Sequence, residues 1–258
     1  MTGRALVTGG APGVVVALAV HLAREGHDVA LHCAGDPEAA ARTVAEIRAL
    51  GRVAVALDAD LLDEAAASAL VPRAAEALGG PMTVLTTAAS VFEHDTFSTA
   101  TRQSWDRHIG ANLRAPFVLM QTFAAQAPEA GRDAAGEALS EGLVVNVIDR
   151  QVLGPTPDFL TYTLAETGLW ALTRTAAQAL APAIRVNAIA VGEALRGTRC
   201  ADAPYAAFRA STTPVTGRGS EPKGLAGCGD AAAALGYLLA AKAVTGQVIC
   251  VGDGHLSG

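Results

Sequence analysis

The chain has 258 residues, of which 51% are hydrophobic and 17% are charged, and its formal net charge is −6. This length and apolar content are typical of one α/β domain with one core, and the acidic balance without a Lys/Arg cluster argues against nucleic acid or an anionic membrane surface as a partner. The cysteines form no Cys-x-x-Cys pair, no apolar stretch is long enough to span a bilayer, and the N-terminus shows no signal pattern, so we expect a cytoplasmic protein without a metal site or disulfides.

Short β-branched runs alternate with helical stretches along the whole chain. The predicted strands lie near Ala5–Thr8, Val29–His32, Val53–Leu57, Thr83–Thr86, Leu143–Ile148, Arg185–Ala190 and Gln247–Val251. The predicted helices lie near Val14–Glu25, Glu38–Leu50, Glu64–Leu78, Arg102–Gln126, Phe159–Leu180 and Asp230–Ala241. With right-handed crossovers, this order predicts a single α/β domain over residues 1–258, a doubly wound parallel sheet of seven strands with helices on both faces.

Two segments interrupt the alternation. Ala127–Glu141 is polar and rich in Gly and Ala, and we expect a surface loop there. Gly192–Gly229 contains three prolines and seven glycines, and it follows the sixth strand at the carboxyl edge of the sheet. Long loops with many glycines at that edge are usually lids, so residues 192–229 are predicted to cover a substrate site.

The first strand leads into a glycine-containing turn, Thr8-Gly9-Gly10-Ala11-Pro12-Gly13. Gly9 and Gly13 stand where a dinucleotide-binding fold uses glycine, so that backbone amides and a helix N-terminus approach a pyrophosphate. The position of a third glycine is occupied by Val15. We expect its branched side chain to narrow the approach to the diphosphate.

A second group of polar residues follows the fifth strand. Asp149 stands at the end of that strand, Tyr162 lies in the first turns of the next helix, and Glu166 follows one helical turn later on the same face. Open α/β sheets bind ligands at the carboxyl ends of their strands. These three residues are therefore the candidate catalytic group.

Several motifs together resemble the short-chain dehydrogenase/reductase family. They are the Thr8-Gly9 start, Asn112 within Ala111-Asn112-Leu113, Tyr162, the strand Arg185–Ile189 and the ending Thr245-Gly246-Gln247. The resemblance covers nearly the whole chain, and Asp149 thirteen residues before Tyr162, His32 and Asp60-Leu61 look like the pteridine reductase branch. It implies a Rossmann-like domain, commonly tetrameric, in which Tyr162 donates a proton, Asn112 holds a water or a backbone kink, and a lysine stands four residues after the tyrosine.

The sequence departs from this family pattern on the cofactor side. Glu166 stands where the family has its lysine, and Thr86-Thr87-Ala88-Ala89 after the fourth strand stands where the family has Asn-Asn-Ala-Gly. After the sixth strand, Val191-Gly192 replaces the family's Pro-Gly. After the second strand, Gly35-Asp36 provides no basic side chain for the 2′-phosphate of NADP. Replacing a cation by an anion about 6 Å from Tyr162 disfavours the ionised phenolate of Tyr162 by up to about 5 kcal/mol, at an effective dielectric constant of about 20. We therefore expect no nicotinamide cofactor, with Gly9, Gly13 and Asp60 as vestigial contacts.

The candidate acidic group allows two interpretations. In the first, Asp149, Tyr162 and Glu166 exchange protons, with one carboxyl as the acid and the other as the base. In the second, Glu166 only fills a vacated site and bonds Arg150 or a loop amide. Candidate substrate contacts lie around the same edge: Phe92, His94, Arg150, Glu193 and Arg196. Arg196 in the predicted lid is a candidate for binding a substrate carboxylate, and the alternative is that it is a solvated charge on a surface loop.

The sequence is compatible with three functions. Our main hypothesis is a redox-neutral acid/base enzyme that acts on a small polar ring or carbonyl compound without a nicotinamide. The first alternative is an NADPH-dependent pteridine-like or carbonyl/imine reductase, and the second is a non-catalytic subunit of an oligomer. The helices predicted at Arg102–Gln126 and Phe159–Leu180 are apolar on more than one face, so a homodimer or homotetramer is expected through them.

Overall fold

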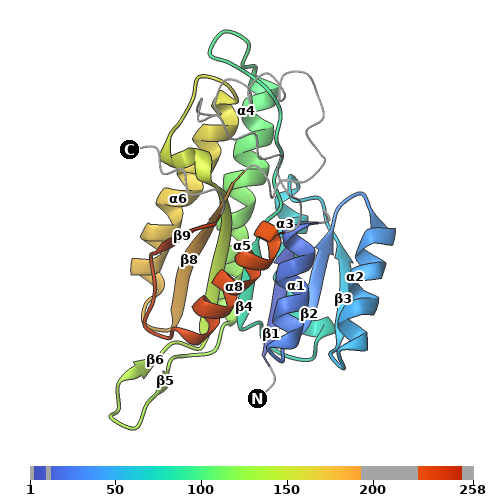
Figure 1. Cartoon of the computed structure of the whole chain (residues 1–258), viewed down its shortest axis with the longest axis vertical. Helices are drawn as coiled ribbons and strands as arrows, with labels where there is room; N and C mark the ends of the chain where they lie inside the picture. Colours follow the sequence, from blue (N-terminus) through green and yellow to red (C-terminus); the bar gives the residue numbers. More distant parts are fainter. Residues whose placement is uncertain (1–2, 10–12, 193–225, 252–258) are drawn as a thin grey trace.

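The computed structural model describes residues 3–9, 13–192 and 226–251. Its main sheet has seven strands in the order β3-β2-β1-β4-β7-β8-β9, and all neighbours pair in parallel (Figure 1). The strands are β1 (Arg4–Thr8), β2 (Asp28–Cys33), β3 (Ala54–Asp58), β4 (Val84–Thr87), β7 (Gly142–Asp149), β8 (Ile184–Val191) and β9 (Val248–Val251). The predicted doubly wound, Rossmann-like sheet is therefore confirmed.

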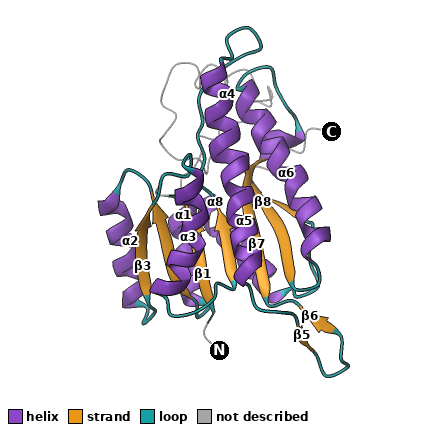
Figure 2. Cartoon of the chain, turned by 180° about the vertical axis from the view of Figure 1, so that it is seen from behind, coloured by secondary structure: helices purple, strands orange, loops and turns teal. Residues whose placement is uncertain are grey.

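Helices cover both faces of the sheet, and each layer encloses its own apolar core. On one face lie α1 (Val14–Arg24), α2 (Pro37–Ala49) and α8 (Ala226–Ala240); on the other lie α3 (Glu64–Ala77), α5 (Ala115–Gln126) and α6 (Leu160–Leu180) (Figures 1 and 2). Leu18 and Val44 belong to the first core, and Leu70 and Phe123 to the second. Strands β7 and β8 are buried along almost their whole length, as central parallel strands must be.

The order of the strands places a switch point between β1 and β4. From β1 the chain proceeds outwards through β2 and β3, and then returns to form β4 on the other side of β1. Strand β7 extends beyond β4, because Thr87 at the end of β4 pairs with Asn146 and β7 continues to Asp149. This stepped carboxyl edge is where doubly wound sheets bind ligands.

The helix predicted over Arg102–Gln126 is divided into three parts. It consists of α4 (Arg102–Ile109), a π-helical turn η1 (Gly110–Arg114) and α5. Asn112 lies in the π-helical turn and bonds the main chain of Val91 twice, through its Oδ1 to the amide (2.8 Å) and its Nδ2 to the carbonyl (2.9 Å). Turns of this kind recur at functional sites, and this one ties the helix to the loop after β4.

The first of the two predicted loops needs correction, and the second needs it only at its end. The insertion before β7 is a short hairpin, β5 (Gly131–Arg132) with β6 (Ala138–Leu139), because Asp133 and Gly136 form a tight turn. Most of the predicted lid, residues 193–225, lies outside the described residues, and residues 226–229 belong to α8. Among the helices described, none is both long and apolar enough to cross a membrane.

Candidate active site

Asp149 and Tyr162 meet at the carboxyl edge of the sheet. Asp149 is the last residue of β7, Tyr162 is the third residue of α6, and both are only 4% exposed. The Tyr162 hydroxyl donates to Oδ2 of Asp149 over 3.0 Å, while the Gln151 amide donates to Oδ1 over 2.7 Å at the start of η2 (Arg150–Leu153). The two residues thus form a buried phenol–carboxyl pair whose geometry is fixed from the strand end.

Glu166 lies beneath this pair, in contact with the strand. Its Oε2 accepts from the main-chain amide of Asp149 over 2.9 Å, and the Asn112 side chain also bonds the carboxyl. Burial raises the pKa of Glu166 to about 8, against a smaller opposing effect of Asn112. At neutral pH the carboxyl is therefore mostly protonated, and the charge-reversal estimate above, which assumed an anion, does not apply. The second interpretation of Glu166 proposed a bond to Arg150 or to a backbone amide, and the structure shows the bond to a backbone amide.

Aromatic rings form one wall beside Tyr162. Phe92 stacks on Phe159 with centroids 4.3 Å apart, and its ring stands edge to face with Tyr162 at 4.6 Å. The His94 ring contacts Phe159 at 5.0 Å. Phe159 precedes α6 with a left-handed backbone, φ 54°, which is uncommon for a non-glycine residue. Sequence reasoning missed Phe159; the only signal was an aromatic residue next to the first turn of the helix.

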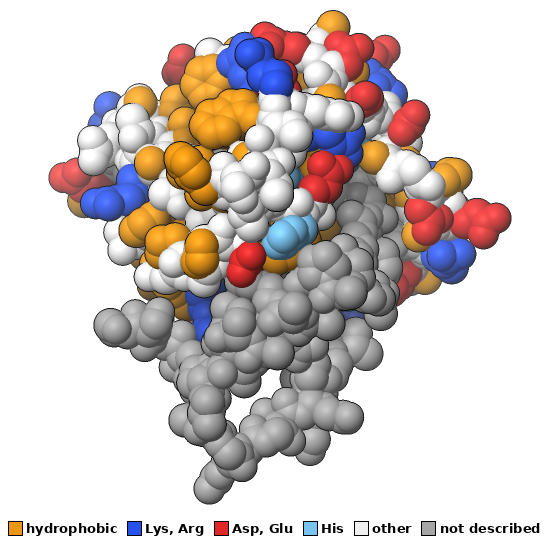
Figure 3. All heavy atoms as spheres, turned by 90° about the horizontal axis from the view of Figure 1, so that it is seen from above, with side chains coloured by type: hydrophobic (Ala, Val, Ile, Leu, Met, Phe, Trp, Pro, Cys, Tyr) orange, Lys and Arg blue, Asp and Glu red, His pale blue; other side chains and the backbone are white. Residues whose placement is uncertain are grey.

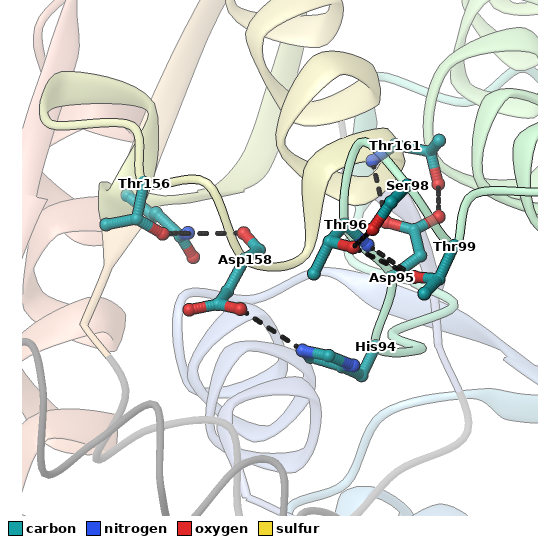
Figure 4. Close-up of polar contacts among 9 residues, drawn as sticks. His94, Asp95, Thr96, Ser98, Thr99, Thr156, Asp158 and Thr161 are labelled. Atoms are coloured by element: carbon teal, nitrogen blue, oxygen red, sulfur yellow. Dashed lines mark hydrogen bonds and ion pairs between the residues drawn. The ribbon is translucent and has the colours of Figure 1, made fainter.

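Polar contacts join the loop after β4 to the start of α6 (Figure 4). His94 Nε2 lies 3.3 Å from Oδ1 of Asp158 at the surface of the site. Deeper, Oδ1 of Asp95 accepts from the Thr161 amide over 3.0 Å, and Oδ2 accepts from the Thr161 hydroxyl over 2.5 Å. Asp95 and Thr161 were not predicted, since they are 66 residues apart and neither belongs to a motif.

Of the remaining predicted substrate contacts, the structure describes only Arg150. Arg150 begins η2 and is half-buried, and it forms no ion pair within the part of the chain that the structure describes. Glu193 and Arg196 lie outside the described residues. Of the predicted set, the structure thus brings Phe92 and His94 together with the phenol–carboxyl pair.

The glycine turn after β1 has a backbone that requires glycine. Gly9 has φ 109°, and a Cβ there would meet the carbonyl of Ala88 at 2.9 Å. The Gly9 amide donates to Nδ1 of His32 over 3.2 Å, so that the neutral ring donates from Nε2 to the Ala59 carbonyl over 2.9 Å. Burial lowers the pKa of His32, in keeping with a neutral ring. These bonds join the ends of β1, β2 and β3 beside Asp60, whose carboxylate accepts from the Leu62 amide.

Several substitutions that suggested loss of the cofactor have other structural consequences. Val15 is 3% exposed, and its side chain packs in the apolar core beneath α1. Asp36 caps α2 by accepting from the Ala39 amide over 2.8 Å. The Thr87 hydroxyl donates to Asn146 over 2.7 Å, and Asn146 donates to Thr173 in α6. Each residue is therefore accommodated within an intact scaffold.

Comparison with known proteins identifies many similar chains. The family model described as short chain dehydrogenase matches residues 4–201. A 3-oxoacyl-[acyl-carrier-protein] reductase FabG of Staphylococcus aureus is 31% identical over 193 residues, 74% of each chain. Granaticin polyketide synthase putative ketoacyl reductase 2 of Streptomyces violaceoruber is 32% identical over 258 residues, 98% of this chain and 96% of the relative.

Solved structures give the same result. FolM alternative dihydrofolate reductase 1 from Brucella canis, complexed with NADP, superposes with a TM-score of 0.79 at 31% identity, covering 99% of this chain and 95% of that one. A short chain dehydrogenase from Burkholderia cenocepacia in complex with NADP gives 0.81 at 27% identity, covering 100% and 99%. These reductases overturn our main hypothesis of redox-neutral chemistry without a nicotinamide, and they favour the reductase alternative.

Proposed function

Because the chain belongs to the short-chain dehydrogenase family, we propose that it is an NADPH-dependent reductase of a carbonyl or imine group on a small ring compound. The buried Tyr162–Asp149 pair is the observation that carries this proposal, because it places a proton donor at the carboxyl edge of the sheet. The ketoacyl reductase relative, matched over nearly the whole chain, supports the reaction class. The FolM neighbours support the resemblance to the pteridine reductase branch.

The glycine turn fits a dinucleotide. Gly13 has φ 98° and directly precedes the N-terminus of α1, where the first helical amides and the positive end of the helix favour a pyrophosphate. Gly9 lies against the Ala88 carbonyl, which holds the start of the turn close to the end of β4. We assign Gly9 and Gly13 to the phosphates, with Asp60, two residues after the end of β3, on the nucleoside side. They are then working contacts of the cofactor rather than vestigial ones.

When bound, NADPH supplies the hydride, and the residues of the chain hold and deliver the proton. Tyr162 is the proton donor: its hydroxyl turns from Asp149 to the oxygen or nitrogen of the reduced group and releases its proton there. Asp149 holds the phenol in place before that transfer. Glu166, which stands where the family has lysine, acts as a neutral acid that fixes the Asp149 amide and contacts Asn112, in place of a cation.

The substrate and the assembly are proposed on the same basis. The stacked Phe92 and Phe159 rings offer a flat apolar wall to a ring compound beside Tyr162.

Trp105 of α4 and Leu164 of α6 are each 44% exposed, and hydrophobic side chains gather on the upper part of the surface in Figure 3. We propose that these helices form the interface of a homodimer or homotetramer.

The test is cofactor binding followed by turnover. Calorimetry with NADPH should give a dissociation constant in the micromolar range, and NADPH oxidation at 340 nm should respond to a panel of aromatic ketones, quinones and pterins. Tyr162→Phe should keep NADPH binding and lose at least 100-fold in kcat, the scale of a lost general acid. If 1 mM NADPH does not bind, the reductase proposal is wrong.

A further inference from the structure

The helix that carries Tyr162 has an unusual start. Phe159 occupies the N-cap position with a left-handed backbone, and its side chain caps nothing. The first helical amides are instead bonded by a residue from the loop after β4: the Leu160 amide donates to the Asp95 carbonyl over 3.3 Å, and the Thr161 amide donates to the Asp95 carboxylate over 3.0 Å. Asp95 therefore replaces the local cap of α6 from a distant part of the sequence.

Thr161 links Asp95 to a buried histidine. The Thr161 hydroxyl donates to Oδ2 of Asp95 and accepts from Nδ1 of His108 over 2.6 Å. The Glu93 amide donates to Nε2 of His108 over 3.1 Å, which fixes the hydrogen of the neutral ring on Nδ1. All three side chains are at most 2% exposed. The network thus joins the loop after β4, α4 and the first turn of α6.

The negative charge of the Asp95 carboxylate is stabilised by its hydrogen bonds. Burial alone would raise the pKa of Asp95, but the hydrogen bonds from the Thr161 hydroxyl, the Thr161 amide and Ser104 hold it below its ordinary value. The carboxylate also lies at the N-terminus of a helix, where negative charge is favoured. For His108, burial lowers the pKa and keeps the ring neutral. A satisfied polar network of this kind permits one arrangement of the three elements and opposes others.

Tyr162 follows Thr161 directly, and its ring stands edge to face with His108 at 5.9 Å. Fixing the backbone and hydroxyl of Thr161 therefore fixes where the Tyr162 side chain leaves the helix. We propose that Asp95, Thr161 and His108 are positioning residues that hold the Tyr162 hydroxyl at its site beside Asp149. This role rests on the proposed function, in which Tyr162 donates the proton, and it adds residues that do not themselves touch the reacting atoms.

The test compares two substitutions at one buried position. Thr161→Val has nearly the same shape but removes the hydroxyl, whereas Thr161→Ser keeps the hydroxyl. One readout needs no turnover: with ¹³C-labelled tyrosine, the ζ-carbon signal of Tyr162 is identified by its loss in Tyr162→Phe, and the other two tyrosines are internal references. The second readout is kcat and KM in the NADPH oxidation assay, with NADPH affinity measured separately.

We expect Thr161→Val to shift or broaden the NMR signal of Tyr162. It should also lower kcat about 10- to 100-fold, because small misplacements of a reacting group have effects of this size. The affinity for NADPH and the KM for NADPH should stay unchanged. Thr161→Ser should restore the signal and most of kcat, and Asp95→Asn should behave like Thr161→Val. The positioning role is overturned if Thr161→Val lowers only the melting temperature and leaves both the Tyr162 signal and kcat as in the wild type. If the wild type neither binds nor oxidises NADPH, the proposed function fails, and the Tyr162 signal alone still decides the positioning role.

Discussion

Glu166 provides the sharpest test of the electrostatics of the site. Its pKa is raised from 4.5 to about 8, so the folded protein retains a proton that the unfolded chain releases. Between these two values the unfolded state binds fewer protons, and stability therefore falls as the pH rises. Each unit is worth about 1.4 kcal/mol, so the loss reaches about 5 kcal/mol at pH 8 and then levels off. Below pH 4.5 the contribution of the neutral carboxyl is fully present.

Glu166→Gln removes this titration and keeps an oxygen for the Asp149 amide. The free energy of unfolding of the variant relative to the wild type should therefore rise by about 3 kcal/mol between pH 5 and pH 7.5. For a chain of this size that corresponds to roughly 6 to 12 °C in melting temperature, measurable by scanning calorimetry or urea denaturation across the pH range.

The exposed Glu38, whose side chain is 89% accessible, supplies the matched control, and Glu38→Gln should follow the wild-type pH dependence. A constant difference between Glu166→Gln and the wild type from pH 5 to pH 8.5 would show that Glu166 titrates normally. The neutral-acid role would then be wrong, and an anion beside Tyr162 would have to be explained.

Three further substitutions test other parts of the site. Gly9→Ala places a Cβ 2.9 Å from the Ala88 carbonyl on a residue whose φ is 109°, so the affinity for NADPH measured by calorimetry should fall at least 10-fold. The control is Gly51→Ala, which also has a positive φ but lies in open space and should leave the affinity for NADPH unchanged. Phe92→Ala removes the ring between Phe159 and Tyr162, and KM for aromatic substrates should rise about 10-fold with NADPH affinity unaffected; equal KM values would remove the aromatic wall from substrate binding. Trp105→Asp should reduce the mass measured by light scattering, and an unchanged mass would place the interface elsewhere.

The fold was predictable because its signals are local. Each buried strand is a short β-branched run, and each helix has its own apolar period, so the alternation specified the layers without any knowledge of contacts. The π-helical turn at Gly110–Arg114 was not predictable, since one extra residue hardly disturbs the apolar pattern of a long helix. The cap of α6 was hidden for a different reason: Asp95 and Thr161 are brought together only by the packing of the loop after β4.

The error about the cofactor came from treating each substitution as an isolated loss of affinity. Val15 was expected to narrow the approach to the diphosphate, yet its side chain belongs to the core beneath α1. Glu166 was assigned the charge it would have in water, yet complete burial keeps it mostly neutral at pH 7 and bonded to the Asp149 amide. A residue type therefore carries a functional meaning only together with its burial and partners, and at this site burial changes the meaning of the most conspicuous departure. If the neutral carboxyl is what allows Tyr162 to work without a cation, activity should decline as the pH rises through about 8 in the wild type, and Glu166→Gln should shift that decline to higher pH.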